Sequence, residues 1–543
     1  MTLLLRLLLP SLIVTLSACG GGGSDSNDEP LPPAEPTHSD ALDLSPVTKA
    51  DSPSPLPANW QRDGVFMEIF VRSYADSDGD GYGDFNGLTS KLDYLQDLGI
   101  TGIWLMPINP SQDNDHNYAV TDYRAIHPHY GSLDDFRTFL DEAHERGIGV
   151  IMDYVINHSA ATNPLFLDSR ENLGGKRSWY SWSDTPPAWV QPWSPETPAW
   201  RLDAVSGSSY LAVFDPIMPD FDLTNPSVVD FHHNNLRFWL NLGLDGFRFD
   251  AVSHMFDANG ALEGDPRNYP FLNQLRQTIN SYPNRYTVCE SSEFVVETAA
   301  SNACGSAFAF YLQWGITDSV IRGSVNSYLD WWLASDFSHM ATLLSNHDGF
   351  AGDRPYSQFG GNLAQYRLAS ATLLTLPGIP FIYYGEEIGM GRNSQGADYG
   401  LRAPMSWDDS ATAGFTTGTP YRALASNKES HNVADQLEDP DSLLNFYKTL
   451  IALRKAEPAL HQGSMTRVAS SRNSVLSFRR SHGDDEILVI LNYGGSQSTN
   501  LTPAMDGDWQ ALYPTDAPVL TTSSSDLLAI TPAAQSVAIY KKL

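Results

Sequence analysis

Cysteines, basic residues and long hydrophobic runs are all scarce in this chain of 543 residues. Once Cys19 is set aside, the remaining cysteines allow one disulfide, between Cys289 and Cys304, and two buried free thiols are the alternative. Lysine and arginine number 33 against 64 aspartates and glutamates, which gives a formal net charge of −31. That charge argues against a nucleic-acid partner and favours a neutral substrate, although a generally acidic proteome would also produce it. The apolar run at residues 7–16 is too short to span a bilayer.

The N-terminus has the organisation of a secretion signal. Arg6 supplies a positive charge, the apolar run follows, and small residues precede Cys19. This end resembles the bacterial lipoprotein signal, and Gly20 after the cysteine implies the outer membrane, on the periplasmic or the cell-surface side; an ordinary cleaved signal is the alternative. We therefore predict a signal peptide over 1–19 and membrane attachment only through lipid on Cys19. Residues 20–55, rich in Gly, Ser, Pro and acidic side chains, predict a disordered linker.

Helical segments that end in glycine and lead into a buried strand recur along the chain. Three copies have their glycines at Gly99, Gly147 and Gly243, and glycine suits the left-handed position that ends a helix. Alternating helices and buried strands indicate a parallel α/β architecture, and we predict a (β/α)8 TIM barrel. The expected strands are 65–71, 102–107, 148–153, 246–250, 286–289, 307–312, 340–345 and 379–384, of which the sixth has the weakest pattern.

Three carboxylates, Asp250, Glu290 and Asp348, each stand at the end of a short apolar run. The C-terminal ends of parallel barrel strands meet at one face, where such folds keep their chemistry. Cleaving a glycosidic bond needs an ionised nucleophile and a protonated acid. Arg248 lies on the same side of its strand as Asp250 and should keep the pKa of that carboxyl low, whereas apolar neighbours favour a protonated Glu290. Singly, each carboxylate could be a strand-end cap; together with Arg248 they predict a catalytic site.

Two stretches break the barrel pattern. Residues 159–226 are rich in Trp and Pro and too long for an ordinary loop, so we predict an inserted domain after the third strand. Its tryptophans either form the insert's own core, which we favour, or stack on sugar rings. Beyond 457, short apolar runs alternate with turns and predict an antiparallel β-sandwich over 458–543. The barrel then comprises 56–158 and 227–457.

The segment 76–84 carries alternate aspartates on a glycine-rich loop, a pattern that can surround one hard cation with oxygen ligands. It resembles the front of an EF-hand loop but lacks the closing glutamate, since Gly87 stands at the twelfth position. We predict one structural Ca²⁺, and a solvated acidic turn is the alternative. The predicted ligands are Asp76, Asp78, Asp80, Asp84 and the carbonyl of Tyr82.

Six ordered segments resemble glycoside hydrolase family 13, the α-amylase family, over about residues 65–407. The resemblance implies that Asp250 is the nucleophile, Glu290 the general acid/base and Asp348 the transition-state stabiliser. Cys289 departs from the family pattern, which has glycine there. The segments are 153–158, 246–254, 288–290, 345–348, 378–387 and 402–407. The substrate-binding residues that the resemblance implies are Tyr118, His158, Arg248, His254 and His347.

Other positions bear on the type of family member. Ala119 stands where many members have an acid. The segment 218–222 has a form between α-amylases and oligo-1,6-glucosidases, and the calcium loop resembles the latter, whereas 251–254 looks more like α-amylase. Asn157, Asp220 and the carbonyl of His254 match a second calcium site of amylases, although each residue also has ordinary structural explanations.

The resemblance implies retaining double displacement, with the Asp250 and Glu290 carboxyls about 5–5.5 Å apart. The leading hypothesis is a monomeric α-amylase-type hydrolase that cleaves α-1,4 bonds of starch or maltooligosaccharides. An exo-acting α-glucosidase, a cyclomaltodextrinase-like enzyme or a glucanotransferase on the same site is the alternative. A hypothesis from a different class is a non-catalytic surface lipoprotein that binds glycans.

Overall fold

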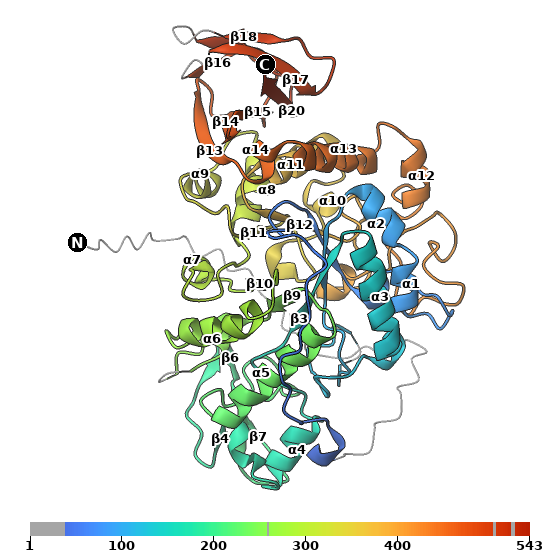
Figure 1. Ribbon diagram of the computed structural model, residues 1–543, viewed down its shortest axis with the longest axis vertical. Helices are drawn as coiled ribbons and strands as arrows, with labels where there is room; N and C mark the ends of the chain where they lie inside the picture. The colour runs from blue at the N-terminus through green and yellow to red at the C-terminus, as the bar shows by residue number, and fades with distance from the viewer. Residues whose placement is uncertain (1–37, 114, 258–259, 503–505, 523–526) are drawn as a thin grey trace, which may run out of the picture.

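A computed structural model describes residues 38–113, 115–257, 260–502, 506–522 and 527–543 (Figure 1). The predicted signal and Cys19 lie outside the described residues. Seven parallel strands form the central sheet in the order β10–β9–β3–β2–β1–β12–β11, and every residue in them is buried. The strands are β1 (Phe66–Ile69), β2 (Gly102–Leu105), β3 (Gly149–Tyr154), β9 (Gly246–Phe249), β10 (Tyr286–Cys289), β11 (Ala341–Thr342) and β12 (Ile379–Tyr383).

The sheet closes into a barrel at its sixth position. Ala307 pairs in parallel with Cys289 at the end of β10, and Phe308 pairs in parallel with Ala341 of β11. The strand expected over 307–312 is therefore only two residues long. Tyr311 has a left-handed φ of 74°, which ends the extended backbone directly before the next helix. The prediction of a TIM barrel followed by an antiparallel domain is confirmed.

Helices surround the barrel (Figure 1). The start of α3 shows how the sequence sets them: Ser132 and Asp135 cap each other's backbone N–H groups, and four buried side chains follow at helical spacing, namely Phe136, Phe139, Leu140 and Ala143. Among the described residues, no helix is long and apolar enough to cross a membrane. The helices are α1 (Phe85–Thr89), α2 (Leu92–Leu98), α3 (Leu133–Glu145), α4 (Pro164–Arg170), α5 (Pro226–Asn241), α6 (Asn268–Asn280), α7 (Val295–Ala299), α8 (Leu312–Arg322), α9 (Ser327–Leu333), α10 (Pro355–Gln358), α11 (Leu363–Thr375), α12 (Val433–Glu438), α13 (Leu443–Ala456) and α14 (Pro458–His461).

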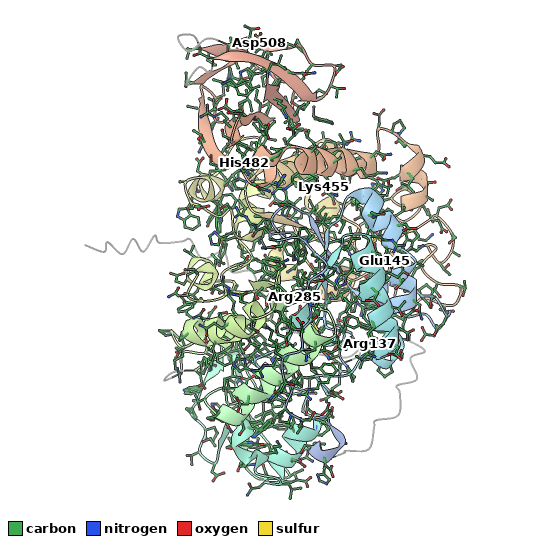
Figure 2. The ribbon with its side chains drawn as sticks, in the orientation of Figure 1. Arg137, Glu145, Arg285, Lys455, His482 and Asp508 are labelled. Carbon is green, nitrogen blue, oxygen red and sulfur yellow. A yellow bond between two sulfur atoms is a disulfide. The ribbon has the colours of Figure 1, made fainter. Side chains whose placement is uncertain are left out.

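A buried ionic cluster closes the N-terminal end of the barrel. Asp245, directly before β9, accepts a hydrogen bond from the N–H of Val150 at 2.9 Å and contacts His144 at 2.7 Å. Arg285, directly before β10 and labelled in Figure 2, reaches the same carboxylate at 3.4 Å. This cluster ties β3, β9 and β10 together at the end of the barrel opposite the three predicted catalytic carboxylates.

The segment between β3 and α5 carries its own short strands. Trp189, Trp193 and Trp200 are half-buried and pack against a small apolar cluster that includes Leu211 and Val213. These tryptophans thus contribute to the core of the insert, as we favoured from the sequence. The strands are β4 (Trp182–Ser183), β5 (Val190–Gln191), β6 (Ser194–Pro198), β7 (Trp200–Leu202) and β8 (Ser209–Leu211).

The C-terminal part forms an antiparallel sheet in the order β18–β17–β20–β15–β14–β13–β16–β19. Strand β15 alternates between two cores: Ile487 and Val489 join the main core with the barrel helices, whereas Leu488 and Ile490 join a separate cluster with Trp509. The strands are β13 (Ser464–Ser470), β14 (Val475–His482), β15 (Asp485–Asn492), β16 (Thr499–Thr502), β17 (Gly507–Tyr513), β18 (Leu520–Thr522), β19 (Leu528–Ile530) and β20 (Ser536–Lys542).

The described part of the predicted linker corrects our expectation. Residues 38–55 lie along the barrel: the N–H groups of Val47 and Ala50 donate to Asn234 and Asn241 of α5 at 2.8 and 2.9 Å. We call residues 38–55 the strap. Near its start, the N–H of Ser39 donates to Asp168 of α4 at 3.1 Å. The composition predicted disorder because it shows only how little apolar surface the segment can bury. An extended segment can also be ordered when its backbone N–H groups find amide and carboxylate acceptors on neighbouring helices.

Candidate active site

The C-terminal strand ends bring the predicted catalytic carboxylates to one place. Asp250 directly follows β9 and Glu290 directly follows β10, while Asp348 lies in the loop after β11. Two further carboxylates join them from inside the barrel, Glu68 of β1 and Asp153 of β3, and both are buried. Our sequence analysis did not assign these two residues a role. Glu68 lies in a buried strand, where the apolar pattern gave no reason to single it out.

Arg248 is the centre of one side of the site. Its Nη1 lies 2.7 Å from Asp250 Oδ1 and 2.8 Å from both oxygens of Asp153. Its Nη2 lies 2.9 Å from Glu290 Oε2. One buried guanidinium thus serves three carboxylates and holds the predicted nucleophile and the predicted acid beside each other.

The backbone around the predicted nucleophile also contacts the acid. Ala251 has a left-handed φ of 48°, which is unusual for a residue with a side chain. In this conformation its N–H donates to Glu290 Oε2 at 3.0 Å. The N–H of Glu290 in turn donates to the carbonyl of Phe249 at 2.9 Å. The N–H of Val252 also donates to the carbonyl of Glu290, at 3.1 Å, so four contacts, counting Arg248, fix Glu290 from β9 and the residues after it.

His347 and Arg402 form the other side of the site. His347 Nε2 lies 3.0 Å from Asp348 Oδ2, and His347 Nδ1 lies 2.5 Å from Glu68 Oε1. Arg402 donates to Asp348 Oδ1 at 3.0 Å and to the carbonyl of His347 at 3.1 Å. Asp115 forms ion pairs with Arg402 and with a second arginine, Arg422. Asp348 consequently has two cationic neighbours.

Tyr118 joins the two sides. Its hydroxyl lies 2.8 Å from Asp153 Oδ2 and 2.9 Å from His347 Nε2, and Arg248 Nη1 lies 3.3 Å from the same oxygen. The Tyr118 and His347 rings are nearly parallel, with centroids 5.7 Å apart. The resemblance implied that this ring stacks on a sugar; in the structure its hydroxyl also completes a hydrogen-bonded chain between the two sides.

The pKa values of Asp250 and Asp348 shift in opposite directions. Burial raises the pKa of Asp250 well above its usual value, and the nearby Glu290 and Asp153 add to this, although Arg248 opposes it. Burial also disfavours ionised Asp348, but His347 and Arg402 outweigh it and hold the pKa of that carboxyl well below its usual range. Our expectation that Arg248 keeps the pKa of Asp250 low is therefore wrong, because burial and two neighbouring carboxylates outweigh the one guanidinium.

His347 is a cation at neutral pH. Burial alone would lower its pKa, but Asp348 and Glu68 on its two nitrogens raise it to about 10. Both ring nitrogens then donate, which matches their contacts with two carboxylates.

The other two predicted histidines contact the inserted segment. His158 and His254 both pack against Phe214 of the insert, with ring centroids 5.4 and 5.3 Å away. Burial lowers the pKa of His158 to about 3, so it is neutral and suited to hydrogen bonding. His254 Nδ1 lies 2.8 Å from the carbonyl of Leu262. The structure thus places His158 and His254 beside the insert. The other predicted substrate-binding residues, Tyr118, Arg248 and His347, lie among the carboxylates.

The acidic loop gathers three of its predicted ligands. Carboxylate oxygens of Asp76, Asp78 and Asp84 lie within 4.8 Å of one another, an oxygen set that fits a hard divalent cation. Asp80 lies outside this group, and its Oδ1 accepts a hydrogen bond from the N–H of Tyr82 at 2.8 Å. The predicted set is therefore reproduced for three aspartates, while Asp80 serves the turn.

The residues of the second possible calcium site line one small cavity. Asn157 Nδ2 donates to Asp220 Oδ1 at 3.0 Å, and His254 lines the same cavity. Burial, with Asp257 nearby, raises the pKa of Asp220 well above its usual value. The three residues lie together, and the Asn157–Asp220 hydrogen bond also gives these two the ordinary structural role that we left open.

Comparison with known proteins agrees with this geometry. The α-amylase catalytic-domain family matches residues 68–463. Alpha-amylase 3 of Dictyoglomus thermophilum is 34% identical over 459 residues, 81% of this chain and 86% of that protein. The trehalose synthase/amylase TreS of Mycolicibacterium smegmatis is 34% identical over 502 residues, 81% of this chain and 85% of that protein.

A solved structure supports the same assignment. The α-glucosyl transfer enzyme XgtA superposes with a TM-score of 0.78 at 28% identity, and the match covers 90% of this chain and all of that one. With the family match over the barrel, the relatives above 30% identity and the carboxylates gathered at its strand ends, this chain belongs to glycoside hydrolase family 13, the α-amylase family, and is a glycosidase of that family.

Proposed function

We propose that the protein is a retaining α-glucan hydrolase of the α-amylase type that cleaves α-1,4 bonds of starch or maltooligosaccharides. One observation carries the proposal: Arg248 bonds Asp250 and Glu290 at the same time, at 2.7 and 2.9 Å. Two carboxylates on one guanidinium stay close, which suits the separation of about 5–5.5 Å that double displacement requires.

In the proposed mechanism Asp250 attacks the anomeric carbon while Glu290 protonates the leaving oxygen. Water, deprotonated by Glu290, then cleaves the covalent glycosyl-enzyme. Three carboxylates share Arg248, so this side of the site holds more acidic groups than its one cation balances. Asp348, kept ionised by His347 and Arg402, would stabilise the positive charge that develops on the sugar ring.

The first test is Asp250→Asn, which keeps the shape of the side chain and removes the nucleophile. We expect the hydrolysis rate to fall by at least about 10⁴-fold while maltooligosaccharide binding remains. Asp134→Asn, at an exposed aspartate of α3, is the matched control. Turnover in the Asp250 variant near the control value would reject the catalytic assignment, and a β-anomeric first product would reject retention.

Glucosyl transfer or exo-acting hydrolysis at the same site is the second candidate. The names of two similar proteins, a trehalose synthase/amylase and an α-glucosyl transfer enzyme, favour it. Products from starch, pullulan and maltotriose separate the cases: mixed maltooligosaccharides for α-amylase action, mainly glucose for exo action, and new linkages for transfer. A protein that binds these glucans without converting any of them would be the non-catalytic lipoprotein.

We also propose that the acidic loop holds one structural Ca²⁺. Asp76, Asp78 and Asp84 would supply its carboxylate ligands, and the ion would tie the loop between β1 and α1 to its surroundings. Addition of Ca²⁺ to the chelated protein should raise the melting temperature of the wild type and not that of Asp78→Asn. An equal response in both proteins would place the ion elsewhere.

For the location of the protein we propose an outer-membrane lipoprotein anchored through Cys19. The support is the sequence of residues 1–19, with its basic, apolar and small-residue regions before the cysteine. Labelled palmitate should enter the wild type expressed in a Gram-negative host and should not enter Cys19→Ala. Release of unlabelled, processed wild type into the soluble periplasmic fraction would instead indicate an ordinary cleaved signal.

A further inference from the structure

The barrel is weakest beside the predicted acid. Most neighbouring strands pair over three or four residues, as β9 and β10 do from Gly246 to Phe249. The sixth position pairs with each neighbour through a single residue, Ala307 on one side and Phe308 on the other. Two backbone hydrogen bonds of 3.1 Å join it to β10, from Cys289 to Ser306 and from Phe308 to Cys289. A ladder this short provides little resistance to sliding or opening.

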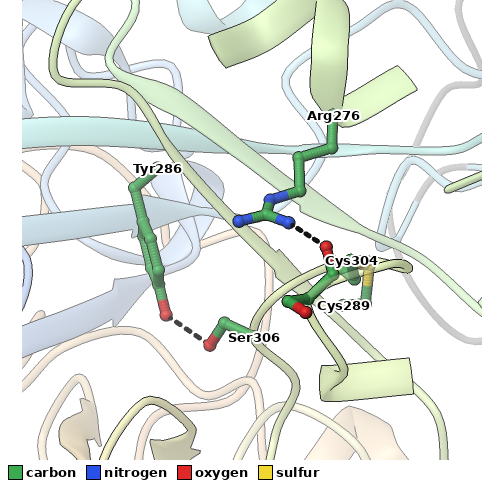
Figure 3. The surroundings of a disulfide bond; sticks show 6 residues. Arg276, Tyr286, Cys289, Cys304 and Ser306 are labelled. Carbon is green, nitrogen blue, oxygen red and sulfur yellow. Dashed lines mark hydrogen bonds between the residues drawn. A yellow bond between two sulfur atoms is a disulfide. The ribbon is translucent and has the colours of Figure 1, made fainter. Parts of the chain in front are cut away.

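A disulfide joins the chain at this place. Cys289 is the last residue of β10, and it is bonded to Cys304, three residues before the bridging Ala307 (Figure 3). Both cysteines are buried in the main core. Beside them, the hydroxyls of Tyr286 and Ser306 lie 3.0 Å apart, so the entry into the sixth position is attached to β10 by one covalent bond and one side-chain hydrogen bond.

The loop that the disulfide closes begins with Glu290. On the β9 side this residue is fixed through the carbonyl of Phe249 and the N–H of Ala251, at 2.9 and 3.0 Å. On the other side the loop 291–303, which contains α7, is attached by few polar contacts; Arg276 donates to the carbonyl of Ser301 at 2.8 Å. Without the covalent bond, the loop could shift and take the acid carboxyl away from Arg248.

We propose that the Cys289–Cys304 disulfide is a positioning element for Glu290, which replaces the missing sixth-strand ladder and makes full activity dependent on oxidation. The proposal rests on the proposed role of Glu290 as general acid/base. Reduction by dithiothreitol breaks the S–S bond and gives two thiols, while the reagent supplies two electrons and two protons and closes to its own cyclic disulfide. The third cysteine of the chain, Cys19, belongs to the predicted signal segment, so we expect no competing intramolecular disulfide.

The test compares two substrates that need the acid to different degrees. Maltotriose has a poor leaving group that must be protonated, whereas α-maltosyl fluoride with azide as acceptor needs neither proton donation nor a base. In the C289A/C304A double variant, and in reduced wild type, we expect kcat on maltotriose to fall about tenfold or more, with KM changed less and activity on the fluoride retained. Reoxidation should restore the reduced wild type.

Two outcomes would overturn the proposal. An equal loss on both substrates, accompanied by a lower melting temperature, would mean that the disulfide only stabilises the fold; no loss on either would mean that the short ladder suffices. Glu290→Gln separates this from the proposed function, because it should lose maltotriose cleavage far more than fluoride turnover. If Glu290→Gln loses both equally, the assignment of Glu290 as acid fails, whatever the disulfide variants show.

Discussion

The predicted nucleophile and the predicted stabiliser, Asp250 and Asp348, have different numbers of cations beside them. Around Arg248, three carboxylates share one cation, and the pKa of Asp250 is raised. Around Asp348, two cations, His347 and Arg402, approach one carboxylate, and its pKa is lowered. Burial raises the pKa of both carboxyl groups, and the number of cations beside each one decides whether burial is outweighed. The first side suits covalent and proton-transfer chemistry, and the second suits stabilisation of a positive charge.

Among the cations that contact the carboxylates, changing the shared one, Arg248, should have the largest effect. Arg248→Lys replaces two separate nitrogens, which contact Asp250 and Glu290, with one nitrogen on an unbranched chain, so we expect kcat/KM on maltotriose to fall by about 100-fold or more. Arg137→Lys, at an exposed position of α3 labelled in Figure 2, is the control and should leave kcat/KM unchanged. A variant that folds, by circular dichroism, and keeps more than a tenth of the activity would show that the bridging geometry is unimportant.

A smaller loss is expected on the cation-rich side, where two cations serve Asp348. Arg402→Lys cannot keep its contacts with Asp348, Asp115 and the carbonyl of His347 together, but His347 remains. We expect kcat/KM to fall about 10-fold. Arg422→Lys is the matched control, because this arginine contacts Asp115 and not Asp348 in the described structure. If both variants lose the same activity, the Asp115 cluster matters for folding rather than for Asp348.

The pH dependence tests how His347 keeps its charge. Glu68→Gln removes one of the two anions that raise the pKa of His347 to about 10, so that pKa should fall. Because the imidazolium is lost as pH rises through its pKa, the alkaline limb of kcat/KM should move to lower pH, with little change near pH 6. Glu387→Gln, a buried glutamate bonded to Tyr94 instead, should leave the limb in place. An unchanged limb in the Glu68 variant would mean that Asp348 alone sets the charge.

The smallest effect concerns a buried carboxyl that forms no ion pair with any residue that the structure describes. Burial raises the pKa of Glu386 to about 8, and its Oε1 accepts a hydrogen bond of 2.5 Å from Ser345. Between pH 4.5 and about 8 the unfolded chain ionises this group while the folded chain keeps it protonated, so stability falls as pH rises through this window. Glu386→Gln should therefore gain melting temperature relative to wild type between pH 5 and pH 8. Glu145→Gln, at an exposed site, should show no such gain. If the melting temperature of the Glu386 variant differs from that of wild type by the same amount at pH 5 and at pH 8, Glu386 does not ionise in this range as expected.

Most of the barrel could be predicted because buried parallel strands leave short apolar runs and glycine ends the helices before them. The sixth strand could not, since two bridging residues are too few for a periodic pattern. The strap at 38–55 was wrongly expected to be disordered, because its order depends on acceptors such as Asn234 and Asn241 far along the chain.

In the active site, too, local patterns could be predicted from the sequence and contacts between distant residues could not. Local motifs marked Asp250, Glu290 and Asp348, because each follows its strand directly or within a short loop. Glu68 and Arg402 were not assigned roles, since their contacts with His347 and Asp348 join positions distant in sequence.

The sequence by itself determined the strand-and-helix order, the family and the identity of the three carboxylates, because these are written in local patterns of apolar, glycine and acidic residues. Only the tertiary structure decided how the charges are shared. A pKa depends on distance and burial, and the partners that set those of Asp250 and Asp348 come from different strands of the barrel.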